Sequence, residues 1–543
     1  MGKTRVDAAL RGGTGSRINL PTKHHRRIFP GLKKVLLHLA IHPALIVCAL
    51  AADQPQWGQA WSRNMVSGER GLPDAFDPET GTNIKWVAQL GTQTHSTPVV
   101  ADGHVYIGTN NNEPRDPGQK GDRGVFMCFD EKDGKFLWQL VVPKRDEDKY
   151  FDWPEVGICS PATVDAGRVF TVTNRAEVVC LNARGLAHGN EGPFKDEGLH
   201  ATPHSAPPPE FKPLPPATPA VSPGPTDADI VWLFDMPLSA GIWPHDNAHS
   251  SILVRGPHLY VNTGTGVDNT HKKIRTPDAP SLIVLDKATG RLLAREDEHI
   301  APGIFHAAWS SPSLGVVGGR ELIFHCGGDG IVRAFEPLPE NASPGEVHTL
   351  KKVWQHDFDP SAPKEHGLDH VFVSNKKEGP SDFYGMPVFH DGKIYVAGGG
   401  DIWWGKLECW LKCLDAATGK ELWSNPLNKH VMTTPAVKDG LVFIADTRNL
   451  HCVDAKTGEG LWTQELGGEI WASPLLADGK VYIGSRKGDF WIFAAGREKK
   501  VLSTIDLRSP VSATATAAGG VLYVATMKQL FAIRKTADSG VKK

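Results

Sequence analysis

The residues best suited to hold a metal ion lie near the middle of the chain. His245, Asp246 and His249 occupy one short segment, and His306 follows further along. Imidazole nitrogens and carboxylate oxygens are common ligands of zinc and related divalent cations. Their spacing matches no established metal motif, and in a chain with 23 histidines some will lie close together in the sequence by chance. The sequence therefore favours structural or solvent-exposed histidines here, with a metal site formed by His245, Asp246, His249 and His306 as the alternative.

A second group of candidate residues is mostly aromatic or carries imidazole. Each stands directly before a short element, usually rich in Ser, Thr and Pro, that recurs along the chain: His95, Ile158, His249, Trp309, Tyr384, Met432, Trp471 and Ser512. Aromatic and imidazole side chains suit a flat ligand with a polar edge. The residues that we predict to bind such a ligand are His95, His249, Trp309, Tyr384, Met432 and Trp471.

The elements that position these residues are short strands joined by two kinds of turn. A unit of the form Asp-x-x-Thr-Gly-x-x-x-Trp, intact or nearly so, occupies residues 130–138, 286–294, 415–423 and 454–462. Asp and Gly build its turn, and the Trp at its end can cover the next repeat. The other element is a hairpin of apolar strands, often closed by Asp-Gly, which is a strong hairpin signal.

The second strand of this hairpin occurs eight times, at Val105-Tyr106, Val169-Phe170, Leu259-Tyr260, Leu322-Ile323, Ile394-Tyr395, Val442-Phe443, Val481-Tyr482 and Leu522-Tyr523. The shortest spacings, about forty residues, equal a four-stranded propeller blade. The last repeat stops at a third strand near Phe531, whereas the first strand of the chain, around Trp86, stands alone. The sequence thus predicts an all-β, eight-bladed β-propeller of four-stranded antiparallel blades, its ring closed by the strand around Trp86.

The domain organisation follows from this ring. Residues 53–535 are predicted to form the single propeller, with a tail at 536–543. A Pro-rich insertion at 184–229 is either a solvated excursion or a docking segment. In residues 1–52, a basic segment, the apolar run 35–50 and an Ala-x-Ala site predict a signal peptide or, if uncleaved, a membrane anchor. We therefore expect an exported protein of the periplasm or cell envelope.

Composition limits partners and redox chemistry. Lys and Arg number 59 against 61 Asp and Glu, which gives no support to nucleic-acid binding. Four of the eight cysteines fall at the same point of different repeats: Cys128, Cys180, Cys413 and Cys452. We expect these four to be buried in separate blade cores rather than joined in disulfides.

The Asp-x-x-Thr-Gly-x-x-x-Trp unit resembles the PQQ-like repeat of quinoprotein alcohol dehydrogenases and of the propeller lipoprotein of outer-membrane barrel assembly. The resemblance covers about residues 57–535. Trp57-Gly58, the segment from Pro244-His245 to Ser251, and the run 264–268 are similar to a group of exported bacterial PQQ-like proteins. The resemblance implies a propeller with a central funnel.

The long connections of such a ring indicate its functional face. They fall at 110–124, 144–157, 235–248, 267–280, 296–307, 356–383 and 399–409, all on the face where the innermost strands begin. Loops that elaborate one end of a rigid scaffold usually carry its function. The candidate ligand-binding residues should rim the funnel there. The alternative is that they plug the channel.

The resemblance to the dehydrogenases implies PQQ and Ca²⁺ in this funnel, but the residues that would hold them differ. The chain has no adjacent cysteines, Thr265 stands in place of the family's metal-binding Asn, and the segment from His306 to Ser310 lacks the catalytic Asp. We therefore predict a non-catalytic scaffold, expected to be a monomer, that binds a protein or a small molecule through its funnel face. A PQQ-dependent dehydrogenase or redox carrier, with Asp246 and Asp268 as substitute carboxylates, is the alternative.

Overall fold

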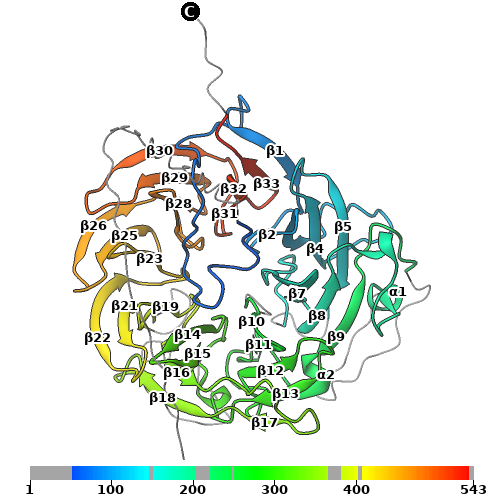
Figure 1. Ribbon diagram of the computed structural model, residues 1–543, viewed down its shortest axis with the longest axis horizontal. Coiled ribbons are helices and arrows are strands. Elements are labelled where there is room, and N and C mark those ends of the chain that lie inside the picture. Colours follow the sequence, from blue (N-terminus) through cyan, green and yellow to red (C-terminus); the bar gives the residue numbers. More distant parts are fainter. Residues whose placement is uncertain are drawn as a thin grey trace, which may run out of the picture. The chain divides into compact units, whose positions relative to one another are not determined.

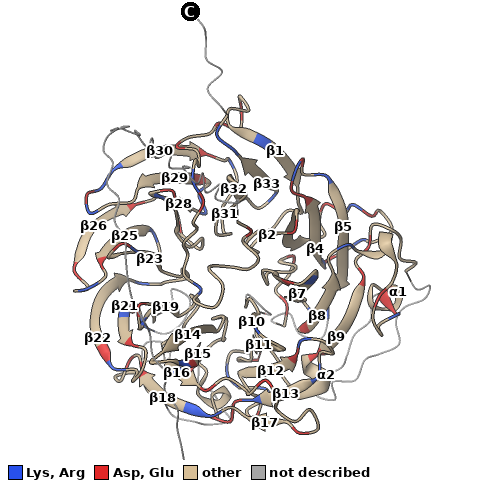
Figure 2. Cartoon of the chain, viewed as in Figure 1, with Lys and Arg blue, Asp and Glu red and all other residues tan. Residues whose placement is uncertain are grey.

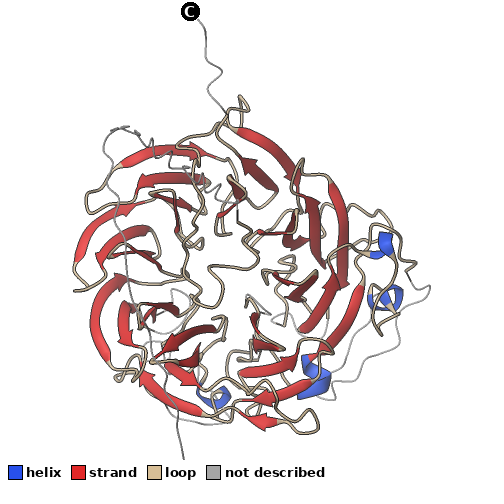
Figure 3. Cartoon of the chain, in the orientation of Figure 1, coloured by secondary structure: helices blue, strands red, loops and turns tan. Residues whose placement is uncertain are grey.

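Each repeat folds as one blade of four antiparallel strands, and the blades surround a central channel (Figures 1 and 3). The computed structural model describes residues 52–145, 151–202, 221–246, 250–268, 270–364, 379, 381–400 and 406–536, which lie in one compact unit, 50–543. All eight hairpins predicted from the sequence are present, so the eight-bladed β-propeller is confirmed.

The blades are numbered along the chain, and the strands of each blade are named in order from the channel outward. They are β2 (Val99–Ala101), β3 (His104–Asn110), β4 (Arg123–Asp130) and β5 (Phe136–Pro143) in blade 1; β6 (Thr163–Asp165), β7 (Arg168–Val172), β8 (Glu177–Asn182) and β9 (Ile230–Asp235) in blade 2; β10 (Leu253–Arg255), β11 (His258–Asn262), β12 (Leu282–Asp286) and β13 (Leu292–Arg295) in blade 3; β14 (Ser313–Val317), β15 (Arg320–Cys326), β16 (Ile331–Phe335) and β18 (Lys352–Asp357) in blade 4; β19 (Val388–His390), β20 (Lys393–Gly399), β21 (Glu408–Asp415) and β22 (Glu421–Asn428) in blade 5; β23 (Ala436–Lys438), β24 (Leu441–Ala445), β25 (Asn449–Asp454) and β26 (Gly460–Glu465) in blade 6; β27 (Leu475–Ala477), β28 (Lys480–Gly484), β29 (Asp489–Ala494) and β30 (Val501–Asp506) in blade 7; and β31 (Thr516–Ala518), β32 (Val521–Ala525), β33 (Gln529–Ile533) and β1 (Ile84–Gln89) in blade 8.

The strand around Trp86 closes the ring, as predicted. β1 pairs antiparallel with β33, with Val87 opposite Phe531 and Ala88 opposite Leu530. The inner strands β2 and β31 of the first and last blades are also in contact. Blade 8 is therefore built from both ends of the propeller, which covers the edge that β33 would otherwise expose.

The Trp that ends each repeat unit packs against the turn of the next blade. The Trp86 indole lies where a Cβ on Gly134 would come within 2.6 Å of a ring carbon, and its Nε1 donates to the Glu131 carbonyl at 3.0 Å. The same packing pairs Trp138 with Gly185, Trp232 with Gly290, Trp354 with Gly419, and Trp423 with Gly458. These glycines also adopt positive φ, between 62° and 76°. The turn thus needs Gly for its backbone and for the indole above it, and the predicted cover by Trp is confirmed.

Blade 3 lacks this Trp and is covered in another way. Its fourth strand carries Ala294, and β17 (His348–Thr349) pairs with that strand in parallel as a fifth strand. Leu338 and Leu350 pack with Ala294 in one buried cluster. The insertion between β16 and β18 therefore fills the position that Trp occupies in the fourth strands of blades 1, 2, 4, 5, 6 and 8.

Residues 54–69, here called the N-terminal plug, cross the channel and bond to the inner side of every blade in order (Figure 1, blue trace at the centre). From blade 1 to blade 8 the contacts are Gln54 with Val100, Pro55 with Val164, Trp61 with Val254 and Leu314, Ser62 with Phe389, Asn64 with Val437, Met65 with Leu476, and Glu69 with Gly520. The buried Arg63 guanidinium donates to the carbonyl oxygens of Ser251 and Pro312. The plug closes the channel at the level of the inner strands, and nothing in the repeat pattern predicts it.

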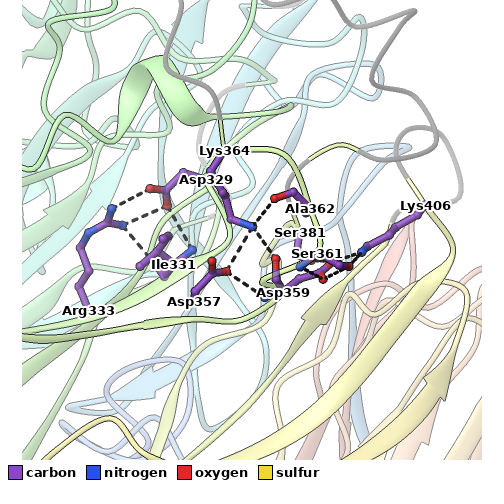
Figure 4. A network of polar contacts seen from close by, with 10 residues as sticks. All are labelled: Asp329, Ile331, Arg333, Asp357, Asp359, Ser361, Ala362, Lys364, Ser381 and Lys406. Carbon is purple, nitrogen blue, oxygen red and sulfur yellow. Dashed lines mark hydrogen bonds and ion pairs between the residues drawn. The ribbon is translucent and has the colours of Figure 1, made fainter.

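Charged side chains join the long connection between blades 4 and 5 to the long connection within blade 5 (Figure 4). Lys406, just before β21, pairs with Asp359, which follows β18. Lys364 donates to the Asp359 carbonyl at 2.7 Å and lies 3.2 Å from Asp357. These contacts place the connections after β18 and after β20 side by side, as the assignment of both to one face requires.

Helices are few in the described residues. They are α1 (Glu197–His200), α2 (Met236–Ala240) and the 3-10 turns Leu186–His188 and Ala301–Gly303. Among these residues no helix is long and apolar enough to cross a membrane. Part of the Pro-rich insertion is folded: His200 of α1 lies 2.9 Å from the buried Glu177 carboxylate. Its runs Pro207–Pro209 and Pro213–Pro216, like residues 1–51 and 537–543, lie outside the described residues.

Charge and cysteine distribution agree with the expectations from composition. Figure 2 shows Lys and Arg interspersed with Asp and Glu around the outer strands of the blades, while the inner strands carry few charges. Cys128, Cys180, Cys413 and Cys452 are buried and not in disulfides, each in a different apolar cluster. The prediction of separate, buried thiols is confirmed.

Candidate functional site

Above the plug the channel opens into a cavity of about 410 Å³, here called the central pocket. Of the residues predicted to rim the funnel, it is lined by His95, Trp309, Tyr384, Met432, Trp471 and Ser512. The sequence analysis missed others that also line it, among them Trp57, Asp152, Trp153, His271 and Arg486. The predicted residues thus lie around one cavity, except Ile158, which is not among its lining, and His249, which lies outside the described residues.

The floor of the central pocket is formed in part by the plug. Trp57 lines the pocket, and its Nε1 donates to the Thr514 hydroxyl at 3.2 Å. Because the plug fills the channel, the residues at the start of the inner strands are not needed for that purpose. Six of them line the central pocket instead.

Aromatic side chains form two opposite parts of the wall. The Trp309 and Tyr384 rings lie 4.8 Å apart, and the Trp471 ring lies 5.5 Å from His95. The Arg486 guanidinium stacks 3.9 Å above the Trp471 ring. Trp309 and Tyr384 line the cavity, and their side chains are only 6% and 5% exposed. Their rings pack against each other where blades 4 and 5 meet.

Three histidines meet at one side of the pocket. Ligand-capable atoms of His245, His271 and His306 all lie within 4.8 Å of one another. His245 and His306 approach most closely, with their Nε2 atoms 3.1 Å apart. All three side chains are buried, and desolvation lowers the pKa of His245 to about 3, so its imidazole is neutral at physiological pH. Among the described residues this is the group of histidine, cysteine and acidic side chains that could hold a metal ion.

The run 264–268 holds two of these histidines in place. His245 Nδ1 donates to the Val267 carbonyl at 2.9 Å, and the Val267 N–H donates to the His306 carbonyl at 3.0 Å. A Cβ on Gly266 would come within 2.8 Å of the His245 Cβ and 2.6 Å of the His306 carbonyl oxygen. Gly266 therefore allows the loop to pass between the two segments, which explains its place in the motif.

The carboxylates proposed from the sequence take different positions. Asp246 lines the pocket, and its carboxylate is 3.7 Å from His245 Nε2. Asp268 does not line it, because its side chain accepts hydrogen bonds from Thr270 and from the Lys272 N–H. The structure thus joins His245, Asp246 and His306, leaves Asp268 in its own loop, and adds His271. The turn that Asp268 stabilises carries His271, which has a φ of 56°.

A buried carboxyl group lies in the connection that enters blade 2. Asp152 lines the pocket and is 3% exposed. It accepts a hydrogen bond from Asn174 at 3.0 Å and lies 3.4 Å from the Lys144 ammonium. Burial raises its pKa to about 7, against the opposing effect of Lys144. The sequence gives no signal for this residue beyond its place in a long connection on the funnel face.

A calcium–quinone centre of the dehydrogenase kind does not fit these residues. Ca²⁺ needs six to eight oxygen ligands, carboxylates above all. Thr265, in place of the metal-binding Asn, is fully buried, and the carboxylates among the described lining are Asp152, beside Lys144, and Asp246. The compact donor group found among the described residues consists of imidazole nitrogens, which suit a softer cation than Ca²⁺.

Comparison with known proteins agrees with this fold. The family described as the outer membrane protein assembly factor BamB matches residues 348–445 and 407–537. The structure of BamB from Moraxella catarrhalis is 13% identical in sequence, and the match covers 82% of this chain and 98% of that chain with a TM-score of 0.50. A europium-containing methanol dehydrogenase is 12% identical, covering 87% and 90% with a TM-score of 0.53. No curated protein sequence matches. The chain is a β-propeller built from PQQ-like repeats.

Proposed function

We propose that this propeller binds a small, flat organic molecule with a polar edge in its central pocket and does so outside the cytoplasm. The observation that carries the proposal is the pocket itself: a cavity of about 410 Å³ with aromatic walls and a floor formed in part by the plug. Small-molecule sites are typically of this size, mostly apolar and largely pre-formed. The rigid blades hold these walls in place before any ligand arrives, so binding costs little ordering.

The residues divide the work of binding. Trp471, half-buried at the start of its inner strand, lines the pocket, so a flat ring can pack against the part of its indole that Arg486 leaves uncovered. Arg486, stacked on Trp471 and donating to the Ser512 hydroxyl at 2.8 Å, supplies a positive charge at the same side. A ligand with an acidic edge suits this pair, because the guanidinium can donate a charge-assisted hydrogen bond to a carboxylate beside its contact with Glu469, whose carboxylate lies 3.6 Å from Nε.

The binding test is a pair of tryptophan replacements. Trp471→Ala, and Trp309→Ala combined with it, should abolish retention of any small molecule that mass spectrometry finds with the purified wild-type protein. A titration followed by tryptophan fluorescence supplies a defined probe: PQQ, a flat aromatic tricarboxylate, added with and without Ca²⁺. Because Trp309 is buried, the double variant also loses packing, so Trp471→Ala alone carries the conclusion.

The matched control is Trp462→Ala. The Trp462 indole packs on Phe493 of the next blade and donates to the Gly496 carbonyl at 3.0 Å, away from the pocket. Its loss should lower the free energy of unfolding by about 2 to 3 kcal/mol and leave ligand retention unchanged. If Trp471→Ala melts early while retaining the ligand, Trp471 is a packing residue and the pocket assignment is wrong.

A second candidate function is protein binding or assembly through the same face. The match of residues 348–537 to a family described as an outer-membrane assembly factor favours it. Trp153, 44% exposed at the pocket, would then be buried by the partner. Chemical cross-linking in cells separates the two functions. A cross-linked polypeptide that Trp153→Ala removes and Trp471→Ala leaves would favour assembly over small-molecule binding.

Export is part of the proposal and rests on residues 1–52. The mature chain should begin near Ala52 and behave as a monomer. N-terminal sequencing of protein from fractionated cells measures this. A chain with an intact N-terminus in the cytosolic fraction would contradict export, and an intact N-terminus in the membrane fraction would identify an anchor instead of a cleaved signal.

A further inference from the structure

We propose that His245, His271 and His306 form a three-nitrogen site for a zinc-class divalent cation at the edge of the central pocket. Three protein ligands with a remaining position open to a cavity is the arrangement of functional, as opposed to structural, zinc sites. The resemblance to the dehydrogenases implies a Ca²⁺ ion held by oxygen donors in the funnel, whereas this cluster offers nitrogen donors.

The separation of the nitrogens fits one shared cation. Zinc–nitrogen bonds of about 2.0 to 2.1 Å in a tetrahedral site place two ligand nitrogens about 3.3 Å apart. The Nε2 atoms of His245 and His306 are 3.1 Å apart, and ligand-capable atoms of His271 lie within 4.8 Å of both. The His271 ring stacks on that of His306 with centroids 5.5 Å apart, so a rotation of the His271 side chain, which sits on a loop, would complete the set.

The surroundings fix the rings as metal ligands require. A carbonyl oxygen only accepts hydrogen bonds, so His245 Nδ1, 2.9 Å from the Val267 carbonyl, carries its proton. The Nε2 lone pair of a neutral His245 then faces His306. His306 Nδ1 in turn lies 3.4 Å from the Tyr384 hydroxyl. Outer partners of this kind orient ligating imidazoles in most metal sites.

The open side of the site faces the pocket. His271, His306 and Asp246 all line the cavity, whereas His245 is fully buried behind them. The Asp246 carboxylate, 3.7 Å from His245 Nε2, brings a negative charge that offsets that of the cation. The remaining position would take water or an oxygen donor, such as a carboxylate or phosphate of a pocket ligand. This last step rests on the proposed function, while metal binding itself does not.

The competing explanation is a hydrogen-bonded histidine pair without metal. In that case His306 Nε2 donates a proton to His245 Nε2 across the same 3.1 Å. In the metal site all three rings act as ligands, and the Asp268 turn holds His271 beside the other two with a positive φ that few non-glycine residues adopt.

Metal content and a cobalt titration test the proposal on the full-length protein. We expect one equivalent of zinc per chain after purification without chelator. After removal of zinc, Co²⁺ should bind and give the intense visible absorption of a tetrahedral site. Zn²⁺ should displace the bound Co²⁺, and Ca²⁺ should not. His271→Asn should weaken Co²⁺ binding by about 100-fold or more, which exceeds the usual effect of losing a residue that only orients a ligand. Its thermal melting should be unchanged, because the loop that carries His271 lies outside the blade strands.

The control variant is His430→Asn. His430 is also a buried histidine, 5.3 Å from the Tyr384 ring, but lies outside the cluster. Its replacement should leave Co²⁺ binding unchanged. Failure of the wild type to bind Co²⁺ or Zn²⁺ would overturn the site in favour of the hydrogen-bonded pair. Full binding by His271→Asn would also overturn it, because the metal would then be bound elsewhere. Trp471→Ala should keep the metal while losing the organic ligand, so the two proposals fail separately.

Discussion

At the scale of single residues, Asp152 shows how the pocket alters ordinary side-chain chemistry. Its carboxyl group is buried beside Asn174 and Lys144, and burial raises its pKa to about 7. The unfolded chain would release this proton near pH 4. Between these values the folded protein binds a proton that the unfolded chain does not, so the contribution of Asp152 to stability is greatest in acid and is lost as pH rises through about 7.

Asp152→Asn should therefore stabilise the protein at pH 8 more than at pH 5. The free energy of unfolding of the variant minus that of the wild type should rise by at least about 1 kcal/mol from pH 5 to pH 8, because one pKa unit corresponds to about 1.4 kcal/mol. Urea unfolding at both pH values measures it. Asp122→Asn is the control, since Asp122 lies 3.5 Å from the same Lys144 but is 29% exposed. Parallel pH dependence of Asp152→Asn and wild type would show that the carboxyl is ionised throughout.

The histidines show what local sequence can and cannot predict about a site. His245 and His306 are predicted candidates because each enters a blade beside a recognisable motif, and both reach the cluster. His271 is missed because it lies in the long connection after β11, and only the fold of the run 264–268 turns that connection back over His245. Its signal in the sequence is Asp268, whose carboxylate stabilises the turn before His271.

At the scale of elements, the sequence predicts what repeats and misses what occurs once. The hairpins, the Asp-Gly turns and the Trp over the next turn recur, so each copy supports the others. β17 occurs once and pairs with the strand that carries Ala294 in place of Trp, and no repeat predicts this extra strand. The N-terminal plug also lacks periodicity, because its hydrogen bonds follow the circle of inner strands instead of one sheet. Its trace in the sequence is Trp57-Gly58, where Gly58 takes a φ of 74°.

At the scale of the whole molecule, the ring is closed twice by the N-terminal part of the chain. β1 completes blade 8 at the outer edge, and residues 54–69 bond to all eight inner strands or their turns. Stability in a propeller otherwise comes from contacts between neighbouring blades. The plug adds contacts that link each blade to every other through one segment, and it supplies part of the floor of the central pocket.

Two deletions separate these closures. A chain lacking residues 53–90 loses both and exposes β33 as an open edge, so we expect aggregation. A chain lacking only 53–70 keeps β1 and should remain soluble. It should nevertheless lose at least about 3 kcal/mol of unfolding free energy, because buried groups such as the Val437 N–H and carbonyl, which bond to Asn64, lose their partners. Size-exclusion chromatography and urea unfolding measure the two effects. A soluble monomer with unchanged unfolding from the larger deletion would refute closure by β1. Unchanged unfolding of the smaller deletion would show that the plug fills the channel without stabilising the ring.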